Sequence, residues 1–506
     1  LVVAAGTVPA AVTALRAVWL RAAGTAHDPV RFAHLRGFIG RQGYDHLMEV
    51  SGTGIRSHYM GTHDRRVQLP LASAKPHTNQ FWDKVWEFVK TGRVLLLPGS
   101  FALGLDIVSS PIGATPKHNA EGEVTEAVRF FHHLSKKAEG QDINGNTDKA
   151  AHGVVFYPVV KRIIKDVLYW SLKYPGTKVL LDLFDVNGAF TQMMVHADDT
   201  RHAATDMPTP GGCAPLSEEE VLMADDSPRA RRGLSFAINE ELLEKYITII
   251  YLTGTFGGTG TPSQYSIAAM KPIEDYVTSH KPACEHWHGR ERFTNSNYVD
   301  DMIGVNPDWG LRASLGRQAV LGAFYLTLGP DAFNPNKDSP GATRKISLGV
   351  GIDTEKEQVF YSAPRVARLR GKVNDKQHDR GNLRVLLQSV QSIHGSLRNM
   401  QGVLRAYRSH FRAIARFLST ADPERVHVVL IGSPELVELR WNQYWDAIEM
   451  FRQLANDDEF WAAGYITSFA GVLSPRERLA LPGELDNRVY MGSDATPLAL
   501  CVIDYA

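Results

Sequence analysis

Two adjacent carboxylates, Asp300 and Asp301, are the residues of this sequence whose types and spacing point most directly to chemistry. They close the string Tyr298-Val299-Asp300-Asp301, which apolar residues follow. An isolated Asp-Asp pair would be an ordinary exposed turn, but a pair flanked by apolar residues also suits the tip of a β-hairpin. A third carboxylate, Asp185, ends the apolar run 179–184. A few carboxylates can hold two Mg²⁺ ions about 3.5–4 Å apart, so the pattern predicts two-metal phosphoryl transfer.

A glycine-rich segment, residues 256–262, lies between these acidic positions. Glycines at this density let the main chain approach a nucleotide or template closely, although such a segment taken alone is usually a turn. It lacks the Lys-Ser/Thr pair of a P-loop. Asp182 is a rival metal ligand, three residues before Asp185, whose simpler interpretation is a charge at a strand edge.

The elements that must position these residues follow from hydrophobic periodicity and turn signals. We expect an amphipathic helix at 79–92, a strand at 179–185, two short strands in 346–361 joined near 353–356, a long helical stretch at 383–418 and a helix at 441–454. The polar stretch 204–233 is interpreted as a surface loop or insertion. The polar stretch 329–345 shows no strand-like alternation.

The order of these motifs resembles the successive palm motifs of reverse transcriptases from retroviruses and retrotransposons, of the gypsy-like or tyrosine-recombinase type. The matching strings are Asp185-x-x-x-Ala189-Phe190, Gly257-x-x-Gly260-x-Pro262 and Tyr298-Val299-Asp300-Asp301. Residues 117–148 are similar to the fingers segment, and residues 334–337 are similar to a later palm motif. Residues 348–349 are similar to the primer-gripping hairpin, and residues 489–496 are similar to the first ribonuclease H-like strand.

The resemblance implies a function, RNA-directed DNA polymerase, a nucleotidyltransferase that extends a primer 3′-end with deoxynucleoside triphosphates on an RNA or DNA template. It implies that Asp185, Asp300 and Asp301 hold two Mg²⁺ ions, with Mn²⁺ as the substitute, and that Lys337 protonates or steadies the pyrophosphate. The remaining roles implied by the family are nucleotide-binding ones, for Arg129, Phe190, Phe256, Gly257, Gly260 and Pro262. Phe190 would disfavour a 2′-hydroxyl, and Arg129 would neutralise the triphosphate.

Some positions depart from the family pattern. His133 stands where the fingers motif usually has Asp, Gly258 where Trp is common, and the gap from Asp185 to Gly257 is longer than expected. These departures motivate an alternative, a catalytically inert retroelement remnant that binds nucleic acid without polymerising. A metal-dependent phosphoester hydrolase that uses the same aspartates is a second alternative.

A basic segment supports nucleic-acid binding independently. Between Arg365 and Arg416 the chain carries twelve Lys and Arg against two Asp, although the whole chain has 55 of each sign. Helical spacing predicts that five arginines share one face of one helix beside an apolar stripe: Arg398, Arg405, Arg408, Arg412 and Arg416. Such a face can follow phosphates without reading sequence.

The implied fold class is α+β, a right-hand polymerase. We expect an N-terminal region of unknown role at 1–75, fingers at 76–174, a ferredoxin-like palm at 175–345, a thumb or connection at 346–425, and a linker with a truncated ribonuclease H-like stub at 426–506. The first 26 residues read as a packed helix rather than a signal peptide. Three cysteines and no long apolar run predict an intracellular protein, cytoplasmic or nuclear, without a membrane partner. The tightly spaced Cys284, His286 and His288 do not match zinc-finger geometry.

Overall fold

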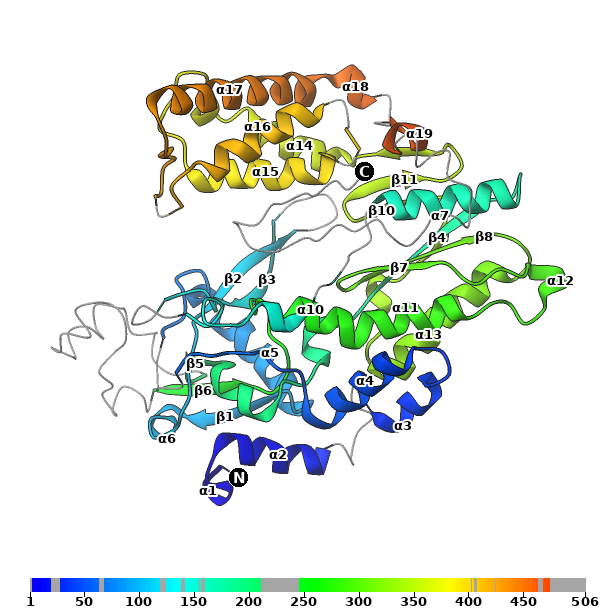
Figure 1. Cartoon of the computed structure of the whole chain (residues 1–506). Helices are drawn as coiled ribbons and strands as arrows, with labels where there is room; N and C mark the ends of the chain where they lie inside the picture. The colour runs from blue at the N-terminus through cyan, green and yellow to red at the C-terminus, as the bar shows by residue number, and fades with distance from the viewer. Residues whose placement is uncertain are drawn as a thin grey trace. The chain divides into compact units, whose positions relative to one another are not determined.

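The computed structural model describes residues 2–19, 28–62, 68–118, 124–137, 142–153, 155, 160–210, 245–401, 403–404, 407–423, 425–462 and 467–473. Helices and strands are mixed throughout these ranges (Figure 1). The chain divides into two compact units. Unit 1 comprises Leu1–Val155, Asp185–His280 and Gln318–Lys337, and unit 2 comprises Phe156–Phe184, Lys281–Arg317 and Asp338–Ala506. No helix in the described ranges is both long and apolar enough to cross a lipid bilayer.

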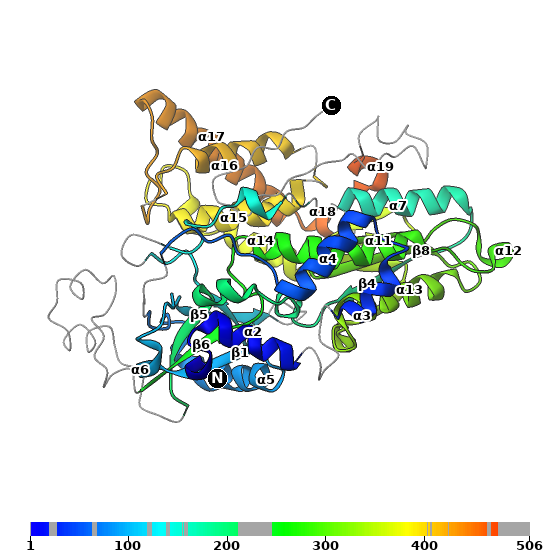
Figure 2. The same cartoon turned by 60° about the horizontal axis from the view of Figure 1, so that its bottom comes forward.

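Unit 1 is built on a three-stranded antiparallel sheet in the order β1-β6-β5. Its strands are β1 (Val94–Pro98), β5 (Ala204–Pro208) and β6 (Tyr246–Tyr251). Side chains alternate between the two faces, so Ile250 packs in the core under helix α2 (Val8–Trp19) and Ile249 packs in the core under helix α5 (Thr78–Lys90). Figure 2 shows α2 lying along this sheet. The predicted helices at the N-terminus and at 79–92 are therefore confirmed as elements that cover the sheet.

Unit 1 contains further helices, single turns and a β-hairpin. They include α1 (Val2–Ala5), α3 (Pro29–Phe32), η1 (Ala33–Leu35), α4 (Arg41–Thr53), η2 (Lys75–His77), α6 (Gly99–Ala102), the hairpin β2 (Ile112–His118) and β3 (Val124–His132), and η3 (Ala150–His152). Later in the chain come η4 (Ala189–Gln192), η5 (Ala197–His202), α10 (Thr261–Tyr265), the π-helix η7 (Ser266–Met270), α11 (Lys271–Ser279) and η8 (Pro335–Lys337).

Unit 2 contains a four-stranded sheet in the order β7-β8-β4-β9. Its strands are β4 (Val179–Asp185), β7 (Asn295–Tyr298), β8 (Asp301–Pro307) and β9 (Ser339–Ala342). Helix α7 (Val160–Lys173) packs Ile163, Val167 and Trp170 into the same core as Leu181 and Ile303. The predicted strand at 179–185 is confirmed. Strand β4 and helix α13 (Arg312–Leu328) each continue from one unit into the other along the chain.

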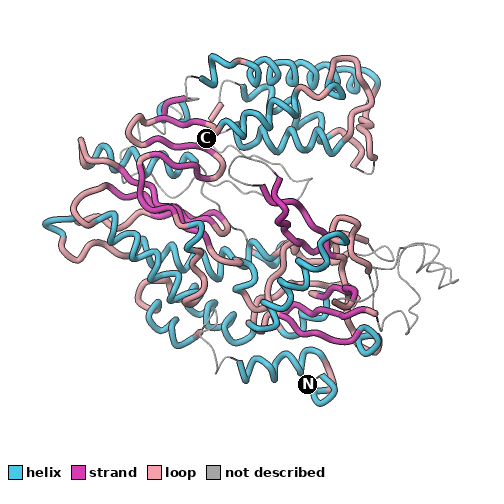
Figure 3. The backbone as a smooth tube through the Cα atoms, turned by 180° about the vertical axis from the view of Figure 1, so that it is seen from behind, coloured by secondary structure: helices cyan, strands magenta, loops and turns pink. Residues whose placement is uncertain are grey.

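A second four-stranded sheet and a helical bundle complete unit 2. The sheet runs β10 (Arg344–Ser347), β11 (Val350–Asp353), β12 (Gln358–Phe360) and β13 (Thr467–Ser468). The helices are α12 (Glu285–His288), α14 (Ala363–Val373), η9 (Lys376–His378), α15 (Leu387–Gln401), α16 (Arg408–Ser419), α17 (Pro434–Asn456), α18 (Asp458–Ala462) and α19 (Phe469–Val472). Helices α14 to α17 lie side by side as the bundle drawn in cyan at the top of Figure 3.

Four sequence expectations about elements were wrong in part. Residues 204–208, expected in a loop, form the buried strand β5, and residues 211–233 lie outside the described residues. The stretch 329–345 contains β9, paired with β4. The segment 346–361 forms parts of three strands rather than two, although the turn at 353–356 is confirmed. The helical stretch 383–418 is two helices, α15 and α16. The expected ribonuclease H-like start at 489–496 lies outside the described residues.

Candidate functional site

Asp185 ends β4 in a nearly enclosed position, with its side chain 10% exposed. The ammonium of Lys337 lies 2.8 Å from Oδ1, and Asn334 donates from Nδ2 to Oδ2 at 2.9 Å. Main-chain bonds align the two segments, because Asn334 N donates to Asp185 O and Asn187 N donates to Ala332 O. The two predicted catalytic residues of unit 1, Asp185 and Lys337, therefore meet.

Asn334 was not selected from the sequence as a site residue. It opens the string Asn334-Pro335-Asn336-Lys337 from which Lys337 was chosen. A short polar side chain three residues before the lysine, next to a proline that starts the single turn η8, was the available signal. Its amide satisfies the second carboxylate oxygen, so Asn334 positions Asp185 beside Lys337.

The aromatic residues predicted to meet the nucleotide gather in unit 1. The Phe190 ring centroid is 4.8 Å from that of Phe256 and 5.6 Å from that of Tyr265. The Arg129 guanidinium, on β3, lies over the Phe256 ring at 6.0 Å from its centroid. Gly188, at a φ of 58°, turns the chain from β4 into the single turn η4 that carries Phe190. The structure thus groups Arg129, Phe190 and Phe256 with one another, and their contact with a nucleotide stays a prediction.

The glycine-rich segment is shaped by close packing. Gly257 has a φ of 114°, and a Cβ there would lie 2.0 Å from the carbonyl oxygen of His132. A Cβ on Gly260 would lie 1.9 Å from the imidazole of His152. Pro262 stands in the first turn of α10, where a missing N–H is tolerated. The glycines are therefore needed because the loop runs directly against two segments that precede it in the chain.

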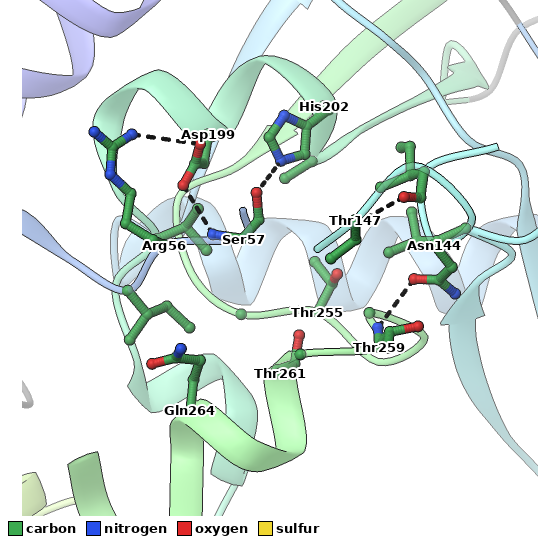
Figure 4. A pocket seen from close by; sticks show the side chains of 18 of the residues that line it. Arg56, Ser57, Asn144, Thr147, Asp199, His202, Thr255, Thr259, Thr261 and Gln264 are labelled. Atoms are coloured by element: carbon green, nitrogen blue, oxygen red, sulfur yellow. Dashed lines mark hydrogen bonds and ion pairs between the residues drawn. The ribbon is translucent and has the colours of Figure 1, made fainter. Parts of the chain in front are cut away.

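Asn144 fixes this loop from the other side. Its side-chain Nδ2 donates to Gly257 O at 2.8 Å, and its Oδ1 accepts from Thr259 N at 2.9 Å. One side chain thereby satisfies two main-chain groups across the loop, as Figure 4 shows for Thr259. In the sequence, Asn144 stands out only as part of the fingers-like segment 117–148. Its role as a positioning residue could not be predicted, because it depends on contacts between distant segments.

A small cavity of about 60 Å³ lies behind this loop within unit 1 (Figure 4). On its wall the Ser57 hydroxyl oxygen is 2.6 Å from His202 Nε2, and Asp199 accepts a hydrogen bond from Ser57 N at 2.8 Å. Arg56 lies 3.6 Å from the same Asp199 carboxylate. These contacts fasten the segment 55–57 to η5. Sequence reasoning did not identify this group, because its members are separated by about 140 positions.

His132 is the last residue of β3, and His133 follows it. Burial lowers the pKa of His132 to about 3, so its imidazole is neutral. The ring meets Tyr251 edge-on at 4.4 Å, and His132 N donates to Phe256 O at 2.9 Å. His133 donates from its main-chain N to Pro111 O.

The Asp300–Asp301 pair stands on a β-hairpin, as predicted. Strands β7 and β8 pair antiparallel with Tyr298 opposite Asp301, which leaves Val299 and Asp300 as a two-residue turn. In the sheet order β8 is the neighbour of β4, the strand that ends in Asp185. Asp300, in the turn, is half-buried, and Asp301, the first residue of β8, is exposed.

Val299 adopts a φ of 54° in this turn. Two-residue hairpin turns need positive φ at one or both central residues, a conformation that β-branched residues avoid. A residue held there costs on the order of 1–3 kcal/mol. Strain stored beside a carboxylate pair is a common property of functional sites.

Val299→Asn is expected to raise the free energy of unfolding by about 1 kcal/mol, because Asn tolerates a positive φ. Urea unfolding of the full chain measures the change. Val426→Asn, at an exposed valine without positive φ, is the matched control and should change stability little. Equal effects of the two substitutions would show that Val299 is not strained.

The expected single basic helical face is divided. Arg398 lies on α15, which ends at Gln401, and Arg408, Arg412 and Arg416 lie on α16. Arg405 lies outside the described residues. Arg398, Arg412 and Arg416 are exposed and Arg408 is half-buried. The apolar stripe is confirmed, because residues of both helices pack into the core of unit 2. The arginines therefore occupy two helices, and the interpretation as one continuous face was wrong.

Asp182, the rival ligand, is 2% exposed and lies in unit 2 with Arg317 at 3.5 Å. Burial raises its pKa, and the Arg317 charge opposes that shift. Arg317 also pairs with Asp338. Asp182 is thus a buried member of an ion-pair group on β4, a strand flanked by β8 and β9, so its interpretation as a charge at a strand edge was wrong.

The residues that the structure describes contain no group of three or more His, Cys, Asp or Glu side chains arranged around a common point for a metal ion. In the Cys284 region, His288 Nδ1 accepts from Leu311 N at 3.1 Å, and Cys284 is exposed. At Asp185 one carboxylate oxygen is paired with the Lys337 ammonium and the other accepts from the amide nitrogen of Asn334.

No known protein family matches this chain, and no curated protein is similar to it in sequence. Two solved structures are similar in fold at a TM-score of 0.42 and 12% sequence identity. One is a foamy viral protease-reverse transcriptase (dRH) in complex with double-stranded DNA. The match covers 84% of this chain and 60% of that protein. The other is a foamy viral protease-reverse transcriptase in complex with an RNA/DNA hybrid. The match covers 85% of this chain and 46% of that protein. The chain thus spans about half the length of these proteins.

Proposed function

We propose that this chain is an RNA-directed DNA polymerase of the retroelement kind that the motif order suggests, gypsy-like or tyrosine-recombinase in type. It would extend a primer 3′-end with deoxynucleoside triphosphates on an RNA or DNA template. The observation that carries the proposal is the 2.8 Å contact between Lys337 Nζ and Asp185 Oδ1. These residues were chosen from two separate motifs 152 positions apart.

The proposed metal ligands are Asp185, Asp300 and Asp301, which would hold two Mg²⁺ ions or, in their place, Mn²⁺. When bound, such ions activate the attacking 3′-hydroxyl and neutralise the leaving pyrophosphate. The nearly buried Asp185 carboxylate has a cationic partner, as an enclosed negative charge requires. The Lys337 side chain is 60% exposed. It can therefore leave Asp185 and donate a hydrogen bond or a proton to the departing phosphate.

The proposed nucleotide contacts are Phe190, Phe256 and Arg129, with the loop from Gly257 to Pro262 as the floor. The Phe190 ring is 7% exposed and is held between Phe256 and Tyr265. A ring confined in this way cannot move aside for a 2′-hydroxyl, so deoxynucleotides would be preferred. Arg129, a residue of β3, would bring a positive charge toward the triphosphate.

Within the proposed right-hand polymerase, 76–174 would be the fingers, 175–345 the palm and 346–425 the thumb or connection. The antiparallel hairpin β2–β3, the sheet β7-β8-β4-β9 and the helices α14 to α16 are the elements that would serve these parts. Arg398, Arg408, Arg412 and Arg416 would contact template and primer phosphates from two helices.

Primer extension on a primed RNA template with deoxynucleoside triphosphates is the direct test. The purified full chain is expected to extend the primer in the presence of Mg²⁺ and to stop when the metal is chelated. Ribonucleoside triphosphates should be incorporated far more slowly because of Phe190. A folded protein that binds the primed duplex without extending it would instead identify an inert nucleic-acid-binding remnant. Cleavage of phosphodiesters without any nucleotide requirement would identify the hydrolase alternative.

A further inference from the structure

Helices α14 and α15 of unit 2 enclose a polar groove of about 380 Å³. Helix α14 contributes Arg365, Arg368 and Lys372, which its periodicity places on one face. Helix α15 contributes the small residues Ser392, Gly395 and Ser396. The volume falls in the range of roughly 300–1,000 Å³ that small-molecule sites occupy. Three cations therefore face a cavity large enough for a ligand.

These cations have no acidic partner in the part of the chain that the structure describes. Other arginines of the same bundle do, since Arg370 pairs with Asp458 and Arg452 pairs with Asp379. Burial lowers the pKa of Arg365 and of Lys372, and the positive charge of Arg368 lowers both further. The groove thus concentrates positive charge that the protein itself leaves unneutralised.

Two of the three cations are held in place before any ligand arrives. The Lys372 ammonium donates to Ser396 Oγ at 2.7 Å and to Ser392 O at 3.3 Å. These two bonds hold the Lys372 side chain across the groove, from α14 to α15. Arg365 donates to Gly349 O and lies over the Tyr361 ring, 5.2 Å from its centroid. Cations fixed in this way lose little side-chain entropy when they bind an anion.

Gly395 keeps the groove open. It lies inside α15, where glycine is about 1 kcal/mol less favourable than alanine. A Cβ built on it meets no atom within 4 Å. Packing within the protein therefore does not require glycine at this position. The absence of a side chain leaves space between the cations and α15.

We propose that Arg365, Arg368 and Lys372, with the Ser392 hydroxyl, form a binding site for phosphate groups in this groove. Guanidinium and ammonium donors bind phosphoryl oxygens with strong charge-assisted hydrogen bonds, and the hydroxyl supplies an additional donor. The Ser396 hydroxyl donates to Ser392 O at 3.0 Å and accepts from Lys372, so it positions the lysine. The phosphates come either from a free polyphosphate or from a nucleic-acid backbone, which present the same oxygens. The site is distinct from the arginines of α16, and it does not depend on whether the chain polymerises.

The test uses the full chain and two probes, inorganic tripolyphosphate by calorimetry and a short RNA/DNA duplex by fluorescence anisotropy. Lys372→Gln keeps a hydrogen-bond donor toward Ser396 and removes one charge. Gly395→Glu places a carboxylate among the cations and fills the open space. Each variant is expected to weaken binding of the preferred probe about tenfold. For the duplex, Lys372→Gln should also reduce the slope of log affinity against log salt by about 1.

Lys376→Gln, an exposed lysine four residues farther along the chain, is the matched control and should bind like the wild type. Gly395→Glu is expected to melt no lower than the wild type, because it improves helix propensity and neutralises the cations. Weaker tripolyphosphate binding by both variants indicates a free polyphosphate, and weaker duplex binding alone indicates the nucleic-acid backbone. The proposal is overturned if neither probe binds the wild type, or if neither variant binds more weakly than Lys376→Gln.

Discussion

Asp300→Asn is expected to lower the rate of nucleotide addition on the order of 10³-fold while the protein remains folded. The substitution preserves the shape of the side chain and removes the charge that a divalent ion requires. Metal-ion stabilisation of phosphoryl transfer is worth several kcal/mol, and about 4 kcal/mol corresponds to a thousandfold change in rate. Asp300 occupies the second position of the two-residue turn between β7 and β8, where Asn is an equally good turn residue.

Asp185→Asn tests the same proposed metal binding at the carboxylate that ends β4. Its loss of rate should be of similar size, because the proposed ions share the three carboxylates. The amide oxygen that replaces the carboxylate could still accept the hydrogen bond from Asn334, but Lys337 would lose its ionic partner. The variant should therefore fold and bind a primed duplex while failing to extend it.

Single-nucleotide incorporation at saturating Mg²⁺ measures these rates, and duplex binding is measured in parallel. Asp308→Asn, at an exposed carboxylate just beyond the last residue of β8, is the matched control and should extend primers at the wild-type rate. Incorporation by Asp300→Asn within a few-fold of this control would remove the hairpin carboxylates from the mechanism.

The features that could be predicted from the sequence are those that local pattern determines. The apolar run 179–184 has the length and composition of a buried strand, and the spacing of Phe81 and Val85 indicates one face of a helix. The hairpin at Tyr298–Asp301 was predicted from an Asp-Asp pair flanked by apolar residues, and its two turn residues are Val299 and Asp300. Asp185 and Lys337 were each selected through the order of motifs, but their contact was not predicted, since no local rule joins residues so far apart.

The failures share a non-local cause. Strand β9 consists of Ser339, Pro340, Gly341 and Ala342, which have low strand propensity, and it is a strand because it pairs with β4. Strand β5 was hidden at the start of a polar stretch, yet all of its residues are buried between β6 and the helices. Tertiary pairing overrides composition in both cases.

The division of α15 from α16 was missed for a different reason. The apolar positions continue with helical spacing across the break because both helices bury their apolar faces in the same core. Periodicity reports burial, and it does not distinguish one long helix from two that pack on a common surface. The arginines beside that stripe therefore could not be assigned to one face from spacing alone.

The glycine-rich loop shows where sequence reasoning found the right residues and an incomplete cause. Glycine was taken to allow a nucleotide to come close. The structure adds that Gly257 and Gly260 allow the main chain of His132 and the ring of His152 to come close. Residues 132, 152 and 257 are remote in sequence, so only the fold reveals this requirement.

Gly257→Ala is accordingly expected to lower the free energy of unfolding by about 3 kcal/mol and to reduce primer extension severely. The new Cβ would lie 2.0 Å from His132 O, a main-chain atom that cannot rotate away, and the φ of 114° is strained for any L side chain. His132 N also donates to Phe256 O, so displacing the loop would break this bond and move the Phe256 ring away from Phe190.

Urea unfolding and single-nucleotide incorporation measure the two effects on one protein preparation. Gly43→Ala is the matched control, because Gly43 lies inside α4 and a Cβ there meets no atom within 4 Å. That control should gain about 0.5–1 kcal/mol of stability through helix propensity and keep its extension rate. If Gly257→Ala matched Gly43→Ala in both measurements, the loop would have to be free to move away from His132. The grouping of Phe256 with Phe190 and Arg129 would then no longer depend on this glycine.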